Sequence, residues 1–461
     1  WDEPHARYAL HADIRHYAAG KLEAQPLLAQ RVRARHATYF TDFVQQREAA
    51  LRGPQQVQVQ AEIESEQQNI LAAWEWAIAR GDEALLARLA HGLFAFYEAK
   101  SRFKEGTRVF QPAIERMRSA AAADPVAARL LRRLLGWQAA LYRQLGQYDQ
   151  ATDLIAAGLA LPGLPSDEGL AFLLLQSAWV AFLQAQYAQV RAWAEQSLAL
   201  YRALGHPAGT GDSLTMLGWT AYELGDYAAA EALCRQAQTA CEQAGYAWGV
   251  QHARYGLGLV RRAQGDYTEA RQCFLQNLEF CEATGYLWGV AQAHINLGLT
   301  ALAQGEAQAA EGFFRQSLSI SESIEHLWGI AQSDTGLGTT ALERRDFPAA
   351  QAWAQRSLTL YQRIQDREGM ADSLLILSQA AQGTGDLAAT RQYLEQAEAL
   401  IRASENGFRA ARALCQRAKL LLQEGETAQA QELLLQTLRH PACERHIYDH
   451  AVAALSALLP P

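Results

Sequence analysis

Half of the 461 residues are apolar and 20% are charged, which excludes an intrinsically disordered chain and supplies apolar surface for an extensive core. The formal charge of -8 argues against a nucleic-acid partner, because nucleic acids need a concentrated basic face; the arginines at 31–35 and 129–133 fit solvated helix faces instead. No apolar run approaches the ~20 residues that cross a bilayer, and no signal peptide opens the chain, so we expect a cytoplasmic protein without a membrane partner.

The first 50 residues do not follow the spacing of the rest of the chain. Their apolar and aromatic groups are Tyr8-Ala9-Leu10-His11, Ile14-Arg15-His16-Tyr17-Ala18, Leu22, Arg35-His36 and Tyr39-Phe40. This set resembles the end of a winged-helix domain that precedes the sensor repeats of STAND proteins, the signal-transduction ATPases with numerous domains. An ordinary helical cap is the alternative. Because the chain begins with Trp1, we expect it to be part of a longer protein.

Residues 51–125 are predicted to form a helical unit that leads into the repeats. A helix at Ile63–Ala79 has one apolar face, and Gly81-Asp82 ends it and starts the next. Further helices are expected at Leu85–Ala99 and Phe103–Met117. The face of the first helix consists of Ile70, Ala73, Trp74 and Ala77. Residues that resemble the start of a STAND sensor are Glu66, Asn69, Ala72, Ala73, Trp76 and Gly81-Asp82.

From about residue 126 onward the sequence repeats itself every 40 residues. The repeated pairs are Leu217-Gly218, Leu257-Gly258, Leu297-Gly298 and Leu337-Gly338, continued by Leu377-Ser378. Turn glycines follow at Gly225, Gly265, Gly305, Gly385 and Gly425, with Ala185 and Arg345 as departures, and then Ala230, Ala270, Ala310, Ala350 and Ala430. Small residues permit close helix packing, and a glycine followed by aspartate ends one helix and caps the next. The sequence therefore predicts stacked helix–turn–helix units.

This pattern resembles the tetratricopeptide repeat (TPR) family in a long form, since the common unit has ~34 residues. The residues that match its signature are Leu217, Gly218, Ala221, Gly225, Tyr227, Ala230 and Ala237. The resemblance implies an all-α, right-handed superhelix with eight repeats over 126–440. A capping helix is expected within 441–461, near 444–458.

Six cysteines without a CxxC pair predict neither a disulfide framework nor a metal site, and no cofactor is expected. Tryptophans recur at Trp248, Trp288 and Trp328, each followed by glycine. A regular aromatic ladder fits either packing between adjacent repeats or a binding surface, and its place at the start of each first helix favours packing.

Within the TPR family, ligands usually contact the concave surface formed by the first helix of each pair. The resemblance places these residues there: Phe172, Leu175, Trp179, Phe182, Asp212, Thr215, Trp219, Tyr222, Glu223, His252, Tyr255, Leu259, Arg262, Gln292, Ile295, Leu299 and Leu302. Exposed aromatic clusters mark recognition surfaces, so Trp219 and Tyr222 are expected to face the groove, while Trp179 fits groove or core equally.

Two functions fit these expectations. The first is the sensor domain of a STAND-type ATPase, which binds a protein, peptide or small-molecule inducer in the groove and contacts an upstream nucleotide-binding module. The second is a free-standing scaffold that docks a peptide or helix of a partner protein. We expect no catalysis, because no GxxxxGK[ST] phosphate loop and no catalytic constellation is present in this sequence.

Overall fold

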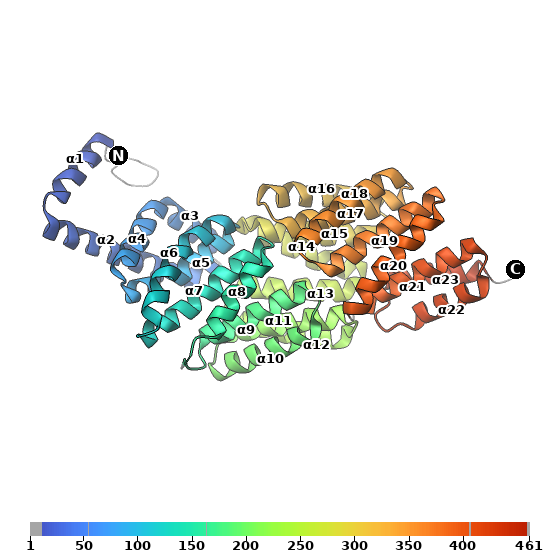
Figure 1. Cartoon of the computed structure of the whole chain (residues 1–461), viewed down its shortest axis with the longest axis horizontal. Coiled ribbons are helices and arrows are strands. Elements are labelled where there is room, and N and C mark those ends of the chain that lie inside the picture. Colours follow the sequence, from blue (N-terminus) through green and yellow to red (C-terminus); the bar gives the residue numbers. More distant parts are fainter. Residues whose placement is uncertain (1–11, 54, 163, 405–406, 459–461) are drawn as a thin grey trace.

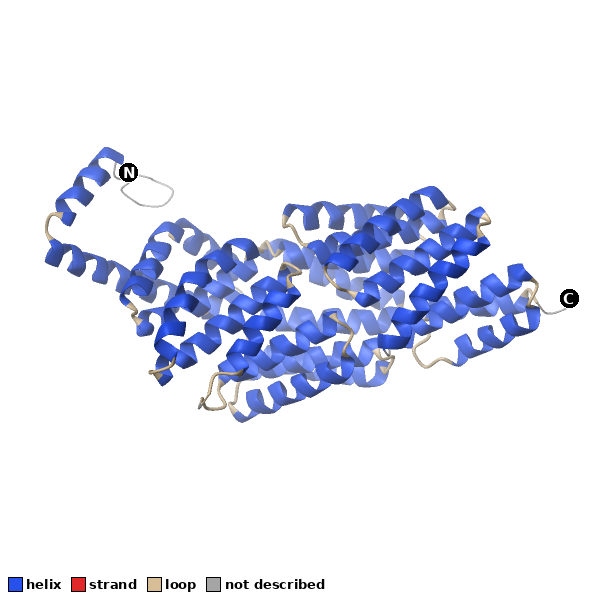
Figure 2. Cartoon of the chain, viewed as in Figure 1, coloured by secondary structure: helices blue, strands red, loops and turns tan. Residues whose placement is uncertain are grey.

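A computed structural model describes residues 12–53, 55–162, 164–404 and 407–458. These residues form helices joined by short loops, and no strand occurs among them (Figure 2). The helices follow one another as antiparallel pairs that wind into an elongated superhelix, with α9–α12 along the lower side of the view and α15–α18 along the upper side (Figure 1). The chain is thus an all-α solenoid.

Eight helix pairs occupy the repeat region. They are α7 (Pro125–Gln144) with α8 (Tyr148–Leu159), α9 (Glu168–Leu183) with α10 (Tyr187–Ala203), α11 (Pro207–Glu223) with α12 (Tyr227–Gln243), α13 (Ala247–Gln264) with α14 (Tyr267–Thr284), α15 (Leu287–Ala303) with α16 (Ala307–Ser323), α17 (Leu327–Glu343) with α18 (Phe347–Arg363), α19 (Arg367–Thr384) with α20 (Leu387–Ser404), and α21 (Gly407–Glu424) with α22 (Thr427–Arg439). A last helix, α23 (Arg445–Ser456), follows them and packs against α21 and α22.

The turn inside each pair has the geometry that the sequence predicted. Gly225 and Gly265 adopt left-handed backbone angles, with φ of 82° and 86°. The carboxylate of Asp226 then caps α12 by accepting the backbone N–H of Ala229 at 3.0 Å. Ala185 and Arg345, which replace glycine in this register, adopt the same left-handed conformation with φ of 58° and 59°. The close packing of the pairs is confirmed as well, because the five alanines Ala230, Ala270, Ala310, Ala350 and Ala430 are all 0% exposed.

The amino-terminal unit contains α1 (Ala12–Glu23), α2 (Pro26–Arg47), the 3-10 turn η2 (Ala49–Arg52), α3 (Gln56–Ser65), α4 (Gln67–Arg80), α5 (Glu83–Ala99) and α6 (Phe103–Ala121). The prediction of a single helix at Ile63–Ala79 is wrong, because Glu66 interrupts the helix between α3 and α4. Its apolar face is nevertheless buried, and the Trp74 indole N–H donates to the Val109 carbonyl at 2.9 Å. Residues Tyr8-Ala9-Leu10-His11 of the expected winged-helix end lie outside the described residues.

The arginines predicted on a solvated face at 129–133 do not all lie there. Arg132 is buried, because its guanidinium donates to the Pro165 carbonyl at 2.9 Å and pairs with Asp167 at 3.2 Å. Across the described ranges, no helix has both the length and the apolar character required to cross a membrane.

Successive turns of the superhelix touch one another. The Tyr222 hydroxyl donates to Glu444, 222 residues further along the chain, at 3.1 Å, and the Tyr187 hydroxyl donates to Glu368, 181 residues on, at 2.5 Å. At the amino-terminal end, the Trp248 indole N–H donates to Gln56 at 2.5 Å. We call these links the turn-to-turn contacts. They join segments that lie 181 to 222 residues apart in the sequence.

Candidate functional site

Two neighbouring cavities remain inside the superhelix. The larger, of about 670 Å³, is called the chamber here and is lined by Glu98, Arg143, Gln144, Phe172, Leu175, Gln176, Trp179, Asp212, Thr215, Tyr246, Trp248, His252, Tyr286 and Trp288. The smaller, of about 370 Å³, is called the socket and is lined by Trp219, Trp248, Gln251, His252, Tyr255, Asn277, Phe280, Cys281, Tyr286, Trp288, Gly289 and Gln292. Both volumes include space that is open to solvent. They share four walls: Trp248, His252, Tyr286 and Trp288.

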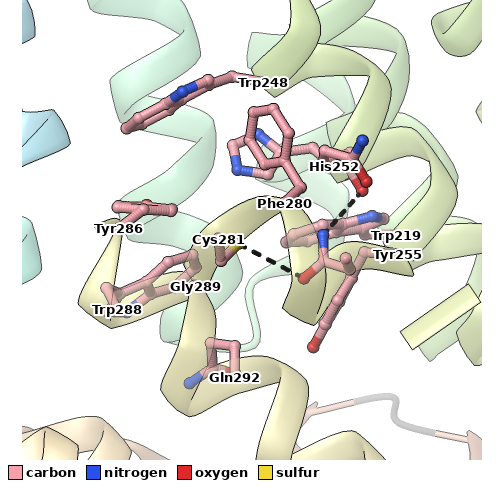
Figure 3. A pocket seen from close by; sticks show the side chains of 12 residues that line it. Trp219, Trp248, His252, Tyr255, Phe280, Cys281, Tyr286, Trp288, Gly289 and Gln292 are labelled. Atoms are coloured by element: carbon pink, nitrogen blue, oxygen red, sulfur yellow. Dashed lines mark hydrogen bonds between the residues drawn. The ribbon is translucent and has the colours of Figure 1, made fainter. Parts of the chain in front are cut away.

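The walls come mainly from the first helices of consecutive pairs, because these helices face the axis of the superhelix. Helices α5, α7, α9 and α11 supply the chamber, while α13 and α15 close it and continue into the socket. Phe280, from α14, is a second-helix residue that reaches the socket. Figure 3 shows Trp248, Tyr286 and Trp288 on one side of the socket and Trp219 and Tyr255 on the other.

The indole N–H groups of the tryptophan ladder are bonded outside the socket. Trp248 donates to Gln56, and Trp288 donates to His326 Nε2 at 3.0 Å. Trp328 makes the equivalent bond to Asp366 at 2.9 Å one repeat later. The ladder therefore packs neighbouring parts of the superhelix together, as the sequence favoured, and Trp248 and Trp288 also turn ring surface toward the cavities.

The chamber combines aromatic and charged groups. The Arg143 guanidinium lies 4.8 Å from the Trp179 ring centroid, and its Nε–H donates to the Gln176 side-chain oxygen at 3.3 Å. Burial lowers the pKa of Arg143, and the charge of Glu98 opposes that shift. Because Glu98 and Asp212 also line the chamber, it presents both donors and acceptors of hydrogen bonds to an occupant.

Burial dominates the electrostatics of the socket. It raises the pKa of the Tyr286 phenol well above its usual value and that of the Cys281 thiol to about 12. It also raises the pKa of Tyr255, although the hydrogen bond that Asn296 donates to its hydroxyl opposes the shift. These directions indicate a poorly hydrated site. No group of three or more His, Cys, Asp or Glu side chains arranged to hold a metal ion occurs within the described part of the chain.

Nine of the seventeen residues assigned to the groove line the cavities. Phe172, Leu175, Trp179, Asp212 and Thr215 lie at the chamber, Trp219, Tyr255 and Gln292 at the socket, and His252 at both. Trp219 is nevertheless only 8% exposed, because it packs against Trp179 and Tyr255 with ring centroids 5.3 and 5.0 Å away. It is a wall of the socket and not a free surface residue.

The other eight residues do not line the cavities. Leu259 is buried, and Leu299 and Leu302 pack against the core. The expected exposure of Tyr222 is wrong: it is 6% exposed and bonded to Glu444 and, at 3.2 Å, to Arg262. Glu223 pairs with Arg409 at 3.4 Å, so it belongs to the turn-to-turn contacts. Phe182 packs on Tyr187, and Ile295 is buried in the core. The superhelix is tighter than an open groove would be.

The concave-face positions did not include several cavity residues. Arg143 and Glu98 precede the first well-matched repeat, so the 40-residue register gave no position for them. Tyr246 and Tyr286 lie just before first helices, and Phe280 lies on a second helix. The regular spacing of Tyr246-Ala247-Trp248 and Tyr286-Leu287-Trp288 was a usable signal for part of this set.

Comparison with known proteins supports the fold. Sequence profiles described as tetratricopeptide repeat match residues 210–244 and 250–323. The structure of a Rap protein complexed with competence and sporulation factor superposes with a TM-score of 0.61 at 12% identity, covering 86% of this chain and 99% of that one. The apo form of the quorum sensor NprR from B. thuringiensis gives a TM-score of 0.48 at 11% identity, covering 82% and 99%. Curated protein sequences give no match. The chain thus folds as a tetratricopeptide-type superhelix.

Proposed function

We propose that this chain is a recognition domain that encloses a segment of polypeptide, a peptide or an extended part of a partner protein, in the chamber and socket. The observation that carries the proposal is the pair of adjoining, aromatic-walled cavities on the axis of the superhelix. Aromatic side chains bury a large apolar area at little entropic cost, and a few polar groups among them fix the orientation of a ligand. The likeness to a Rap protein complexed with competence and sporulation factor supports the binding of a ligand by a superhelix of this kind.

We further propose that the domain acts as a sensor that binds its inducer without catalysing a reaction, as the resemblance of residues 1–120 to STAND-type ATPases implies. The amino-terminal unit supports this proposal, because it reaches the ligand site directly. Glu98 of α5 lines the chamber, and Gln56 of α3 holds Trp248. A ligand in the chamber would therefore contact the amino-terminal unit, which is the part of the chain that would adjoin an upstream module. A free-standing scaffold that docks a partner peptide remains the alternative.

The test is selection of peptides from a random library on the purified chain, followed by measurement of Kd for the wild type and two variants. Trp179→Ala removes an aromatic wall of the chamber, and Trp353→Ala is the matched control. Both tryptophans are half-buried and lie under an arginine, Arg143 or Arg356, but Trp353 lines neither cavity.

We expect Trp179→Ala to weaken binding at least tenfold and Trp353→Ala to leave it unchanged, with melting temperature recorded for each. Equal effects of the two substitutions would contradict a site in the chamber. If peptides bind only after this chain is fused to an upstream ATP-binding module, the result would favour the sensor over the scaffold.

A further inference from the structure

We propose that the socket is a specificity pocket for one bulky apolar side chain, such as Phe, Leu or Met, of the polypeptide segment whose main chain lies in the chamber. This inference rests on the proposed function and goes beyond it, because it names the feature of the ligand that the site selects. The atoms that line the socket decide which chemical groups it can bind.

The socket presents carbon almost everywhere. Six aromatic residues line it, namely Trp219, Trp248, Tyr255, Phe280, Tyr286 and Trp288. Asn277, among its polar walls, is bonded to the protein: it donates to the Gln251 carbonyl at 3.4 Å and accepts a contact from the Cys281 thiol at 3.8 Å (Figure 3). Within the described residues, the buried Trp219 Nε1 and Gln292 Nε2 make no hydrogen bond. The Tyr255 hydroxyl accepts from Asn296 at 3.0 Å. A polar group that enters the socket would lose its hydrogen bonds to water and meet mainly aromatic ring faces. An apolar group is stabilised by the same transfer out of water.

A cation is the other group that aromatic rings bind, and the socket is less suited to it. Burying a cation requires a counter-charge or many ring contacts, and no Asp or Glu is among the lining residues of the socket. The carboxylates Glu98 and Asp212 line the chamber, where Arg143 also lies. Burial is also the largest cause of the raised pKa values of Tyr286 and Cys281, which shows that charged forms are disfavoured at these walls.

The division between the cavities matches the two parts of an amino-acid residue. The chamber holds amide and charged side chains, among them Gln144, Gln176 and Arg143, which suit the N–H and C=O groups of a main chain. The socket adjoins the chamber at the shared walls Trp248 and Trp288. A segment lying in the chamber would therefore direct one side chain into the socket.

The experiment measures binding of four probes by saturation-transfer NMR: N-acetyl-phenylalaninamide, N-acetyl-leucinamide, N-acetyl-alaninamide and tetramethylammonium. We expect binding of the first two, with saturation concentrated on the side-chain protons, and none of the last two. Phe280→Ala removes a half-buried wall and should weaken the phenylalanine probe about tenfold, and Phe280→Trp, which fills the space, should weaken it too.

Ile320→Ala is the matched control, because Ile320 occupies the same register one repeat later, is also half-buried and lines neither cavity. Binding of tetramethylammonium with no binding of the apolar probes would overturn the inference. Library peptides whose binding requires Trp179, but which share no apolar position and ignore both Phe280 substitutions, would also overturn it and leave the proposed function intact. Absence of any Trp179-dependent peptide would remove the proposed function itself.

Discussion

The two ends of the interior are built on the same repeat but differ in the residues that face the axis. Toward the amino terminus, α9, α11, α13 and α15 present aromatic residues around the chamber and socket. Toward the carboxyl terminus, Arg409 of α21 bonds to Glu368 at 2.8 Å and to Asp372 at 2.9 Å on α19, and to Glu223 of the preceding turn. One end leaves space, and the other is closed by charge.

The difference shows that the scaffold residues and the axial residues are independent of each other. The Ala and Gly positions hold every pair at the same spacing, so the residues facing the axis decide whether successive turns enclose a cavity or bind each other. Four predictions test this division, and each compares a substitution with a control variant, with wild type or within a double-mutant cycle.

The largest effect is expected for Arg409→Ala. This substitution removes Arg409 from Glu368 and Asp372, whose side chains are only 12% and 13% exposed, and leaves Asp372 paired with Arg412 at 2.8 Å. Removing one member of a buried ion-pair network costs about 3–5 kcal/mol, as urea denaturation would show. Arg402→Ala, at a 72% exposed arginine paired with Glu398, should cost under ~0.5 kcal/mol. Equal costs would mean that charge does not hold this end closed.

The next effect depends on pH. Asp334 is 0% exposed, its nearest cation is Arg356 Nε at 3.3 Å, and burial raises its pKa to about 7, with a further rise from Glu322. Because the folded state then holds a proton that the unfolded state has released, the unfolding free energy falls as pH rises from about 4 to 7. Asp334→Asn lacks this slope and should gain roughly 2–3 kcal/mol relative to wild type between pH 5 and pH 8. Parallel profiles for the two proteins would contradict the assignment.

A smaller effect is expected for Tyr222→Phe, which removes the hydroxyl that bonds Glu444 and Arg262 across the turns. The loss should be about 1.5 kcal/mol, the lower end for hydrogen bonds to charged groups. Tyr267→Phe serves as the control, because within the described residues the Tyr267 hydroxyl makes no hydrogen bond. If both substitutions are neutral in thermal melts, Tyr222 does not stabilise the contact between turns.

The smallest effect concerns the framework that both ends share. Ser357 and Ser373 are buried and bonded at 2.7 Å, whereas Ala237 and Ala253 occupy the same register three repeats earlier. Replacing both serines by alanine should cost under ~1 kcal/mol, and the double-mutant cycle should show that the single changes are not additive. If the double variant loses several kcal/mol of unfolding free energy, the framework tolerates alanine at these two positions less well than the natural pair Ala237 and Ala253 suggests.

The sequence was sufficient to predict the helix pairs, because each depends on residues within one 40-residue unit. Even the departures at Ala185 and Arg345 follow the register, since the turn imposes its left-handed backbone on whichever residue stands there. The cavities were predicted only in part. Whether Tyr222 is exposed depends on the pitch of the superhelix, which accumulates from small rotations between many repeats, and no local pattern reports it. Trp248 was assigned to packing, which its bond to Gln56 confirms, but its second face on the cavities needed the structure.

The turn-to-turn contacts also impose an order on synthesis. A linear repeat array completes each unit as its neighbour emerges from the ribosome. Here Tyr222 of the third repeat meets Glu444 only after 222 more residues have been made. Arg262 of the next repeat can bond to the Tyr222 hydroxyl, but the contact of this hydroxyl with Glu444 is missing through the translation of five further repeats. The half-made chain has a different surface from the finished one, and that surface is what a chaperone would encounter.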